Sequence, residues 1–161
     1  TEVSAVADKY PQLQELGAEV FSVSVDSHFV HKMWNDHELT KMVDGGVPFH
    51  MLSDQAGNIG RAYGVYDEGQ GIELRGRFII DPEGVLRAMV YYPMNAGRSV
   101  DEIHRLLVAL QTADANHCAM PENWKPGDEV IVPTPATPEA AMARAGEGYN
   151  TVDWYFSTRA L

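Results

Sequence analysis

Residues 74–93, LRGRFIIDPEGVLRAMVYYP, carry a clear local signal for β-structure. Two apolar runs flank the link Asp81-Pro82-Glu83-Gly84. A four-residue link that contains proline and then glycine is typical of a β-turn. The stretch therefore predicts a β-hairpin.

Helices and short strands are expected on both sides of this hairpin. Apolar spacing over 1–17 predicts a helix, which Pro11 is expected to break or kink. The β-branched segment 19–26, EVFSVSVD, predicts a short buried strand. The other expected elements are a helix over about 28–43 capped by Asp26 or Ser27, an extended segment over 49–54, one or two helical turns within 55–64, and a helix over 99–112. This order predicts an α/β fold.

The composition changes at residue 113. Five prolines crowd a stretch with few large aliphatic side chains: Pro121, Pro126, Pro133, Pro135 and Pro138. Such a composition favours an extended arm rather than a second core. We therefore divide the chain into 1–112 and 113–161.

Charge and cysteine content exclude several classes of partner. The 161 residues carry a net charge of −11 at pH 7, which repels phosphate backbones and anionic lipids, so nucleic acid and membrane surfaces are not expected partners. The one cysteine, Cys118, cannot form an internal disulfide. It fits a reducing compartment, here taken as the cytoplasm, or a thiol kept for chemistry.

Several segments resemble a known family. TEVSAVADKY (1–10), VFSVSVDSHFVHKMW (20–34), LRGRFIIDPEGVLR (74–87) and GRSVDEIHRLLVALQ (97–111) resemble successive segments of typical peroxiredoxins, the alkyl hydroperoxide reductase and thioredoxin peroxidase group. PENWKPGDEVIVP (121–133) and GYNTVDWYFSTRAL (148–161) resemble the C-terminal extension of that family. The resemblance implies a partial thioredoxin-like core over 1–112 and a C-terminal extension over 113–161.

The resemblance also implies an activity. Peroxiredoxins reduce hydrogen peroxide and organic hydroperoxides with a thiol, without cofactor or metal, and take electrons from thioredoxin-like or other thiol reductants. It further implies a homodimer, formed edge to edge along VLRAMVYY (85–92), that can build decameric rings. The alternative is a redox-inactive oligomeric subunit with a binding or chaperone-like role.

The family places its nucleophile just ahead of the segment that starts this sequence. There, Pro-x-x-x-Thr-x-x-Cys-Pro precedes Thr-Glu, the dipeptide found here as Thr1-Glu2. The resemblance therefore implies a peroxidatic cysteine, or selenocysteine as in some bacterial relatives, two residues before Thr1. It also implies a leading hairpin and a central strand ahead of Thr1. Residues 1–161 alone are expected to be inactive.

Three residues match the active-site shell of the family. Peroxide reduction needs donors that lower the pKa of the thiol and stabilise charge on the separating oxygens, and the fixed donor fork of arginine does both. The resemblance assigns this role to Arg75, makes Arg98 the second active-site arginine, and makes Glu2 the carboxylate that pairs with both. Arg77 and Arg87 match no active-site position, so we expect them to be surface residues.

The role of Cys118 stays open at this point. Many relatives carry a resolving cysteine just before Pro-x-x-Trp, but in HCAMPENW that position is Met120, and Cys118 is two residues early. The cysteine is either a displaced resolving thiol or an incidental one, in which case an external thiol must resolve the oxidised enzyme. Three histidines at 28, 31 and 37 lack a carboxylate or cysteine to complete a metal site, so no metal is expected.

Overall fold

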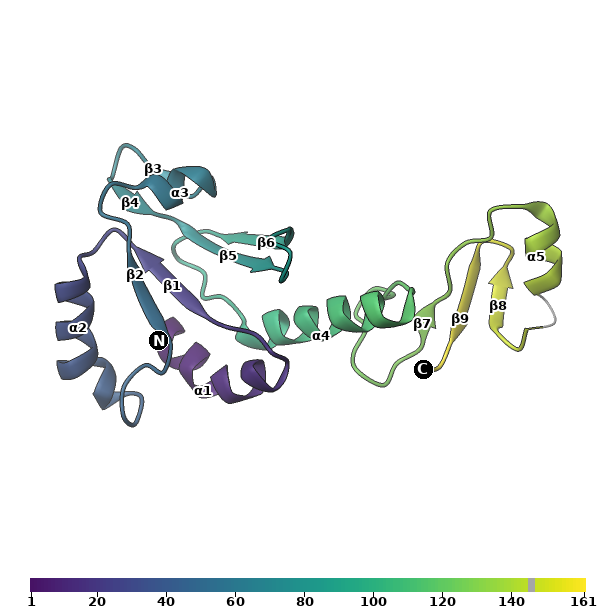
Figure 1. Cartoon of the computed structure of the whole chain (residues 1–161), viewed down its shortest axis with the longest axis horizontal. Helices are drawn as coiled ribbons and strands as arrows, with labels where there is room; N and C mark the ends of the chain where they lie inside the picture. The colour runs from purple at the N-terminus through teal and green to yellow at the C-terminus, as the bar shows by residue number, and fades with distance from the viewer. Residues whose placement is uncertain (145–146) are drawn as a thin grey trace. The chain divides into compact units, whose positions relative to one another are not determined.

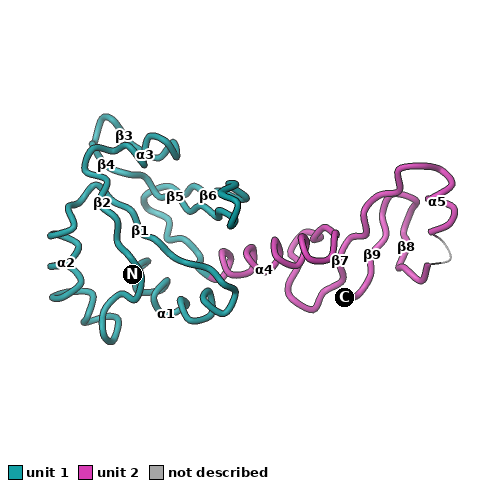
Figure 2. The backbone as a smooth tube through the Cα atoms, viewed as in Figure 1, with its two compact units in different colours: residues 1–100 teal, residues 101–161 magenta. Residues whose placement is uncertain are grey.

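The computed structural model describes residues 1–144 and 147–161, which form two compact units, Thr1–Val100 and Asp101–Leu161 (Figure 2). The first unit contains α1 (Glu2–Glu15), β1 (Phe21–Ser24), α2 (His28–His37), β2 (His50–Ser53), α3 (Asn58–Ala62), β3 (Tyr66–Asp67), β4 (Ile72–Glu73), β5 (Arg75–Ile80) and β6 (Leu86–Tyr92) (Figure 1). Helix α4 (Val100–Asn116) leads into the second unit, which adds β7 (Val130–Ile131), α5 (Pro138–Arg144), β8 (Asn150–Asp153) and β9 (Phe156–Arg159). The compact units divide at residue 100, whereas our division at 112 follows the family segments and stays a prediction.

The hairpin predicted over 74–93 is confirmed as the antiparallel pair β5–β6, with Arg75 opposite Tyr92. Its turn is held by the Asp81 carboxylate, which accepts the backbone N–H of Glu83 at 3.1 Å and of Val85 at 2.8 Å. Gly84 has a φ of +82°, which a residue without a Cβ adopts without strain. The backbone N–H of Gly84 donates to the carbonyl of Asp81 at 2.9 Å, so the predicted β-turn is confirmed, whereas the part of the Asp81 carboxylate was not predicted.

Helix α1 runs through Pro11, so the helix does not break there as one of the two expected outcomes required, and the kink stays a prediction. Proline removes one helical hydrogen bond, but buried side chains lie on both sides of it. Ala7 and Tyr10 precede Pro11, Leu13 follows it, and all three are at most 6% exposed. Packing of this apolar face thus keeps the helix continuous despite the proline.

Two further expectations for the first unit need correction. The helix expected over 28–43 ends at His37 and is followed by a separate 3₁₀ turn, Leu39–Lys41, which buries Leu39 to 1% exposure. Ser27 is the N-cap of α2, and its hydroxyl accepts the backbone N–H of Val30 at 3.3 Å. Strand β1 is not buried as predicted, since Phe21 is 56% exposed.

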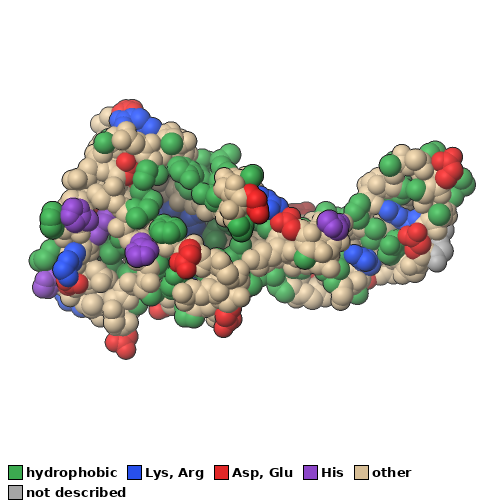
Figure 3. All heavy atoms as spheres, viewed as in Figure 1, with side chains coloured by type: hydrophobic (Ala, Val, Ile, Leu, Met, Phe, Trp, Pro, Cys, Tyr) green, Lys and Arg blue, Asp and Glu red, His purple; other side chains and the backbone are tan. Residues whose placement is uncertain are grey.

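The strands of the first unit form pairs. β1 pairs with β2 in parallel, β3 with β4 and β5 with β6 antiparallel, and no ladder joins these pairs within the described residues. The short β3–β4 hairpin was not predicted. Figure 3 shows several patches of hydrophobic side chains on the visible face of this unit. An edge of β1 and an edge of β5 therefore carry backbone groups without a ladder partner in the described chain.

The second unit has a small core of its own, which corrects the expectation of an extended arm without one. Ala109, Trp124 and Val130 are buried together, at 5%, 3% and 0% exposure. Helix α5 begins after Thr137, whose hydroxyl accepts the N–H of Ala140 at 3.2 Å. Four of the five prolines lie between these elements and Pro138 begins α5, so a proline-rich composition here coexists with local packing.

Candidate active site

The first turn of α1 places Glu2 against two arginines from distant parts of the first unit. Its Oε2 lies 2.5 Å from Arg75 Nη1 and 2.6 Å from Arg98 Nη2. Its Oε1 accepts the side-chain Nε of Arg98 at 3.1 Å and the backbone N–H of Arg98 at 2.7 Å. The three residues that the resemblance singled out are therefore in direct contact, and we refer to them as the Glu2 cluster.

Backbone carbonyls fix the two guanidinium groups further. Arg75, the first residue of β5, donates from Nε to the carbonyl of Met94 at 3.0 Å. Arg98 donates from Nη1 to the carbonyl of Gly76 at 2.7 Å. Arginines held by several directed hydrogen bonds lose little further freedom when they bind a ligand, which suits them to stabilise charge during a reaction.

The electrostatics of the Glu2 cluster favour anions. Hydrogen bonds from the Arg98 side chain, outweighing partial burial, lower the pKa of Glu2 to about 2. Glu2 is therefore ionised at neutral pH, and two guanidiniums face one carboxylate. The cluster lies at the N-terminus of α1, where the helix dipole adds partial positive charge. A thiol placed there has its thiolate form stabilised.

Arg77 is only partly exposed and makes a directed contact, so our expectation of a simple surface residue needs correction. Burial and, next, the positive charge of Arg98 lower the pKa of its guanidinium, whereas Glu2 acts in the opposite direction. Its Nη1 donates to the carbonyl of Ser99 at 3.1 Å. The signal in the sequence was the spacing: residues two apart on a strand share one face, so Arg77 follows Arg75 toward the same side.

Arg87 lies near the turn end of the hairpin and is also only partly exposed. Its side chain is 28% exposed, with Nη1 3.5 Å from Asp81 Oδ2. Arg75 and Arg87 thus lie near opposite ends of one hairpin.

Cys118 belongs to the second unit and is partly buried. It packs against the core of that unit together with Met120, the residue at the position expected for a resolving cysteine. Its Sγ lies 3.9 Å from the carbonyl of Thr112, a weak contact. Its part in chemistry stays a prediction.

The histidines on α2 do not come together around a metal. His31 is buried, and its Nε2 lies 2.8 Å from Ser24 Oγ. No group of three potential metal ligands occurs in 1–144 or 147–161.

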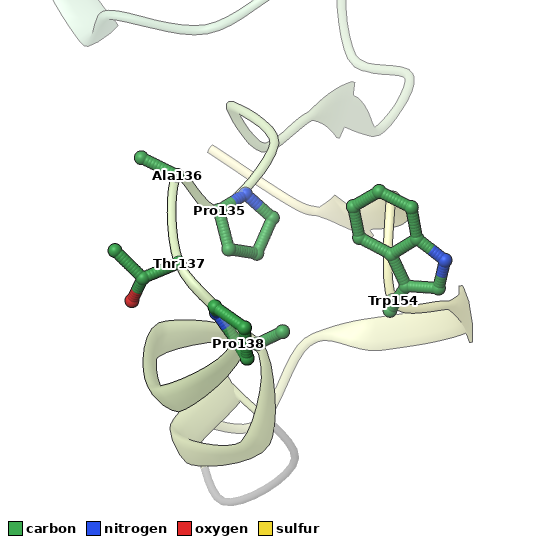
Figure 4. Close-up of a pocket in the computed structure, with 6 residues that line it drawn as sticks. Pro135, Ala136, Thr137, Pro138 and Trp154 are labelled. Carbon is green, nitrogen blue, oxygen red and sulfur yellow. The ribbon is translucent and has the colours of Figure 1, made fainter.

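A cavity of about 380 Å³ lies in the second unit, lined by Pro135, Ala136, Thr137, Pro138, Ala141 and Trp154. Figure 4 shows the proline rings and the Trp154 indole around it. It contains none of the predicted site residues and no ionisable side chain, so we do not assign chemistry to it.

A pair of carboxyl groups in the first unit was not predicted from the sequence. Asp54 is buried and accepts the backbone N–H groups of Asn58 at 2.9 Å and Gly60 at 2.8 Å. Glu73 lies beside it, and its Oε1 is buried without a hydrogen-bond partner in the described chain. Burial, then the hydrogen bond and the charge of Asp54, raise the pKa of Glu73 to about 7. The Glu73 carboxyl therefore keeps its proton to a higher pH than an ordinary glutamate does.

The raised pKa of Glu73 predicts that the free energy of unfolding falls as the pH rises. The pKa of Glu73 is about 7 in the fold against an ordinary 4.5, so between these values the folded state holds a proton that the unfolded state has lost. The contribution is full below pH 4.5 and is lost as the pH passes 7. Thermal melting of the intact protein at pH 5 and pH 8 should show this loss, and Glu73→Gln, which keeps a donor without titrating, should reduce it.

Glu68→Gln is the matched control for this pH prediction. Glu68 pairs with Arg61 at the surface, and hydrogen bonding to Arg61 lowers its pKa. The control should keep the wild-type difference between pH 5 and pH 8. The same difference in wild type and Glu73→Gln would contradict the prediction.

The α/β fold and the Glu2 cluster are typical of a class of enzymes that stabilise a charged nucleophile at a helix N-terminus, and comparison with known proteins identifies the family. The model of the AhpC/TSA family matches residues 1–89, and the model of the C-terminal domain of 1-Cys peroxiredoxin matches residues 109–148. The chain belongs to the AhpC/TSA family.

Individual peroxiredoxins are similar along most of the chain. It is 55% identical over 137 residues to the selenocysteine-containing peroxiredoxin PrxU of Peptoclostridium acidaminophilum, covering 84% of this chain and 68% of that protein. It is 38% identical over 156 residues to peroxiredoxin 2 of Thermoplasma acidophilum, covering 96% and 77%. The predicted family is thus confirmed.

Solved structures confirm the thioredoxin-like α/β fold. A yeast mitochondrial 1-Cys peroxiredoxin, whose thiol is resolved via glutathione/thioredoxin systems, superposes with a TM-score of 0.87 at 27% identity, covering 99% of this chain and 78% of that one. Enterococcus faecalis AhpC superposes with a TM-score of 0.69 at 38% identity, covering 74% and 70%.

Proposed function

We propose that this chain is the greater part of a thiol peroxidase that reduces hydrogen peroxide and organic hydroperoxides. The observation that carries the proposal is the Glu2 cluster, because it presents two fixed guanidiniums at the N-terminus of α1. The relatives named peroxiredoxin support the same reaction. As the resemblance implies, the nucleophile is a cysteine or selenocysteine two residues before Thr1 in the intact protein.

The chemistry begins with attack by the thiolate or selenolate on one peroxide oxygen, in line with the O–O bond. The attacked oxygen keeps its hydrogen and forms a sulfenic or selenenic acid. The other oxygen leaves with the electron pair of the O–O bond and takes up a proton to become water or an alcohol. Arg75 stabilises the charge on the separating oxygens, while Glu2 holds Arg75 and Arg98 in place.

A second thiol completes the cycle. It attacks the sulfenic acid, a disulfide forms, and water leaves. Cys118 is one candidate for this thiol, and an external thiol is the other. The match of residues 109–148 to a 1-Cys C-terminal domain supports the external thiol, and the glutathione or thioredoxin systems that serve the yeast relative supply its chemical class.

We further propose a cytoplasmic homodimer that can build decameric rings. β6 pairs only with β5 in the described residues, and Met89 and Tyr91 on β6 are 57% and 49% exposed, which supports edge-to-edge pairing there. The single cysteine supports a reducing compartment. Among the described residues, none of the helices is long and apolar enough to cross a membrane.

The redox-inactive alternative is not favoured, since the similar relatives are named peroxiredoxins. The coding sequence upstream of Thr1 distinguishes the two functions. A frame that encodes Pro-x-x-x-Thr-x-x-Cys-Pro, or UGA at the cysteine codon, supports the peroxidase. A start codon directly before Thr1 supports the alternative.

Peroxide consumption in excess dithiothreitol tests the assignment of the nucleophile. Residues 1–161 alone should not reach peroxidase rates, because Cys118 lies in the second unit and lacks the helix N-terminus that stabilises a thiolate. The same chain extended upstream by a segment with cysteine two residues before Thr1 should react rapidly, with or without Cys118→Ser. A peroxidase rate from residues 1–161 that Cys118→Ser abolishes would overturn the assignment.

A further inference from the structure

Arg77 and Arg98 each donate a hydrogen bond to a backbone carbonyl next to the other arginine. The Arg98 guanidinium donates to the carbonyl of Gly76, the residue just before Arg77, at 2.7 Å. The Arg77 guanidinium donates to the carbonyl of Ser99, the residue just after Arg98, at 3.1 Å. The two contacts form a reciprocal clasp between β5 and residues 98–99. Each contact spans 22 residues of sequence, so neither follows from local structure.

The clasp acts on the atoms that bind Glu2. Arg98 contacts Glu2 through its guanidinium and also through its own backbone N–H, which donates to Oε1 at 2.7 Å. The Ser99 carbonyl is separated from the Arg98 N–H only by the φ and ψ bonds of residues 98 and 99, so holding this carbonyl narrows the positions that the N–H can take. The Arg77 contact therefore restrains one of the groups that orient Glu2, and Glu2 in turn binds Arg75.

The position of Arg77 is electrostatically unfavourable. Burial and the nearby charge of Arg98 both disfavour its protonated form, as the lowered pKa indicates. A lysine or arginine kept only for solubility lies in solvent, away from like charges. The hydrogen bond to the Ser99 carbonyl offsets part of this unfavourable free energy and holds the Arg77 guanidinium near Arg98.

We propose that Arg77 is a positioning residue of the peroxidase site: it holds the backbone at Arg98–Ser99 so that Arg98 and Glu2 keep Arg75 aligned. Arg77 does not contact the reacting atoms and acts through Arg98. The inference rests on the proposed function, since alignment of Arg75 matters only if Arg75 serves peroxide reduction.

Stopped-flow oxidation of the nucleophile by hydrogen peroxide, in the intact protein, tests this role. Arg77→Met, which keeps the length of the apolar stem but has no donor, should lower the rate constant on the order of tenfold, as losses of supporting contacts do. Arg77→Lys, which keeps the charge and one donor, should recover most of that loss and also serves if Arg77→Met folds poorly. Arg87→Met, at the other end of the hairpin, should stay within about twofold of wild type.

A double mutant separates positioning from a general structural effect. If Arg77 acts through Arg98, adding Arg77→Met to Arg98→Met should cause almost no further loss. If the double mutant instead loses a factor in rate constant equal to the product of the two single-mutant factors, the proposal is overturned. A loss that disappears at high pH, where the nucleophile is fully ionised in every variant, would assign Arg77 to charge rather than position and would also overturn it.

Arg75→Ala distinguishes failure of this inference from failure of the proposed function. If Arg75→Ala has no effect, the function itself is wrong. If Arg75→Ala is severely slowed while Arg77→Met behaves like Arg87→Met, only the positioning role is wrong.

Discussion

In the intact protein, Arg75→Ala should slow attack on peroxide by roughly a hundredfold, the typical result of losing one donor aimed at developing charge. The Arg75 guanidinium is held by Glu2 at 2.5 Å and by the Met94 carbonyl at 3.0 Å, so its remaining donors have a fixed direction. Alanine removes the fork and leaves Glu2 paired with Arg98 alone. Stopped-flow measurement of the second-order rate constant for nucleophile oxidation reports the change.

Arg87→Ala is the matched control because it lies on the same hairpin. It removes a guanidinium near the turn, where Asp81 is its ion-pair partner, and should change the rate constant less than about twofold. Equal, small effects of the two substitutions would remove Arg75 from the site.

The second large effect concerns folding of residues 1–161 on their own. Pairs of strands are marginally stable in water, and three or more strands with a covered apolar face are needed for independent stability. β1–β2 and β5–β6 are such pairs, and Phe21, Ile80 and Met89 are exposed on them at 56%, 47% and 57%. Because total stabilities are only about 5–15 kcal/mol, residues 1–161 alone should be molten or aggregated.

An upstream segment should restore order by supplying the central strand that the resemblance implies beside β1. Near-UV circular dichroism and thermal melting compare residues 1–161 with the chain extended at its N-terminus. The extended chain should melt cooperatively. A sharp transition from a monodisperse sample of 1–161 would show that the fold closes without the strand, and that the expected strand order is wrong.

The parts of the fold that were predictable are those set by residues close together in the sequence. The Asp81-Pro82-Glu83-Gly84 turn and the apolar spacing of α4 depend on neighbours in sequence, and both elements formed as expected. The β3–β4 pair was not predictable because each strand has two residues, too few for a periodic pattern. The second unit was read as an arm because its core consists of a few side chains separated by prolines.

The Glu2 cluster was predictable only through the resemblance. No local pattern connects Glu2 with an arginine 73 or 96 residues away, since tertiary packing alone brings them together. Arg77 was misread because matching to the family pattern gave it no role, although strand alternation put it on the face of Arg75. Glu73 was missed because burial, which sets its pKa, is a property of the fold.

The long separations within the Glu2 cluster make activity a late product of folding. Closing loops of 73 and 96 residues costs entropy that only the assembled unit can offset, so contacts of this kind form slowly. Until they form, the N-terminus of α1 has no arginine beside it. If the nucleophile lies two residues before Thr1, as proposed, we therefore expect it to react weakly with peroxide while the apolar surfaces are still uncovered, and to gain reactivity once the first unit has closed.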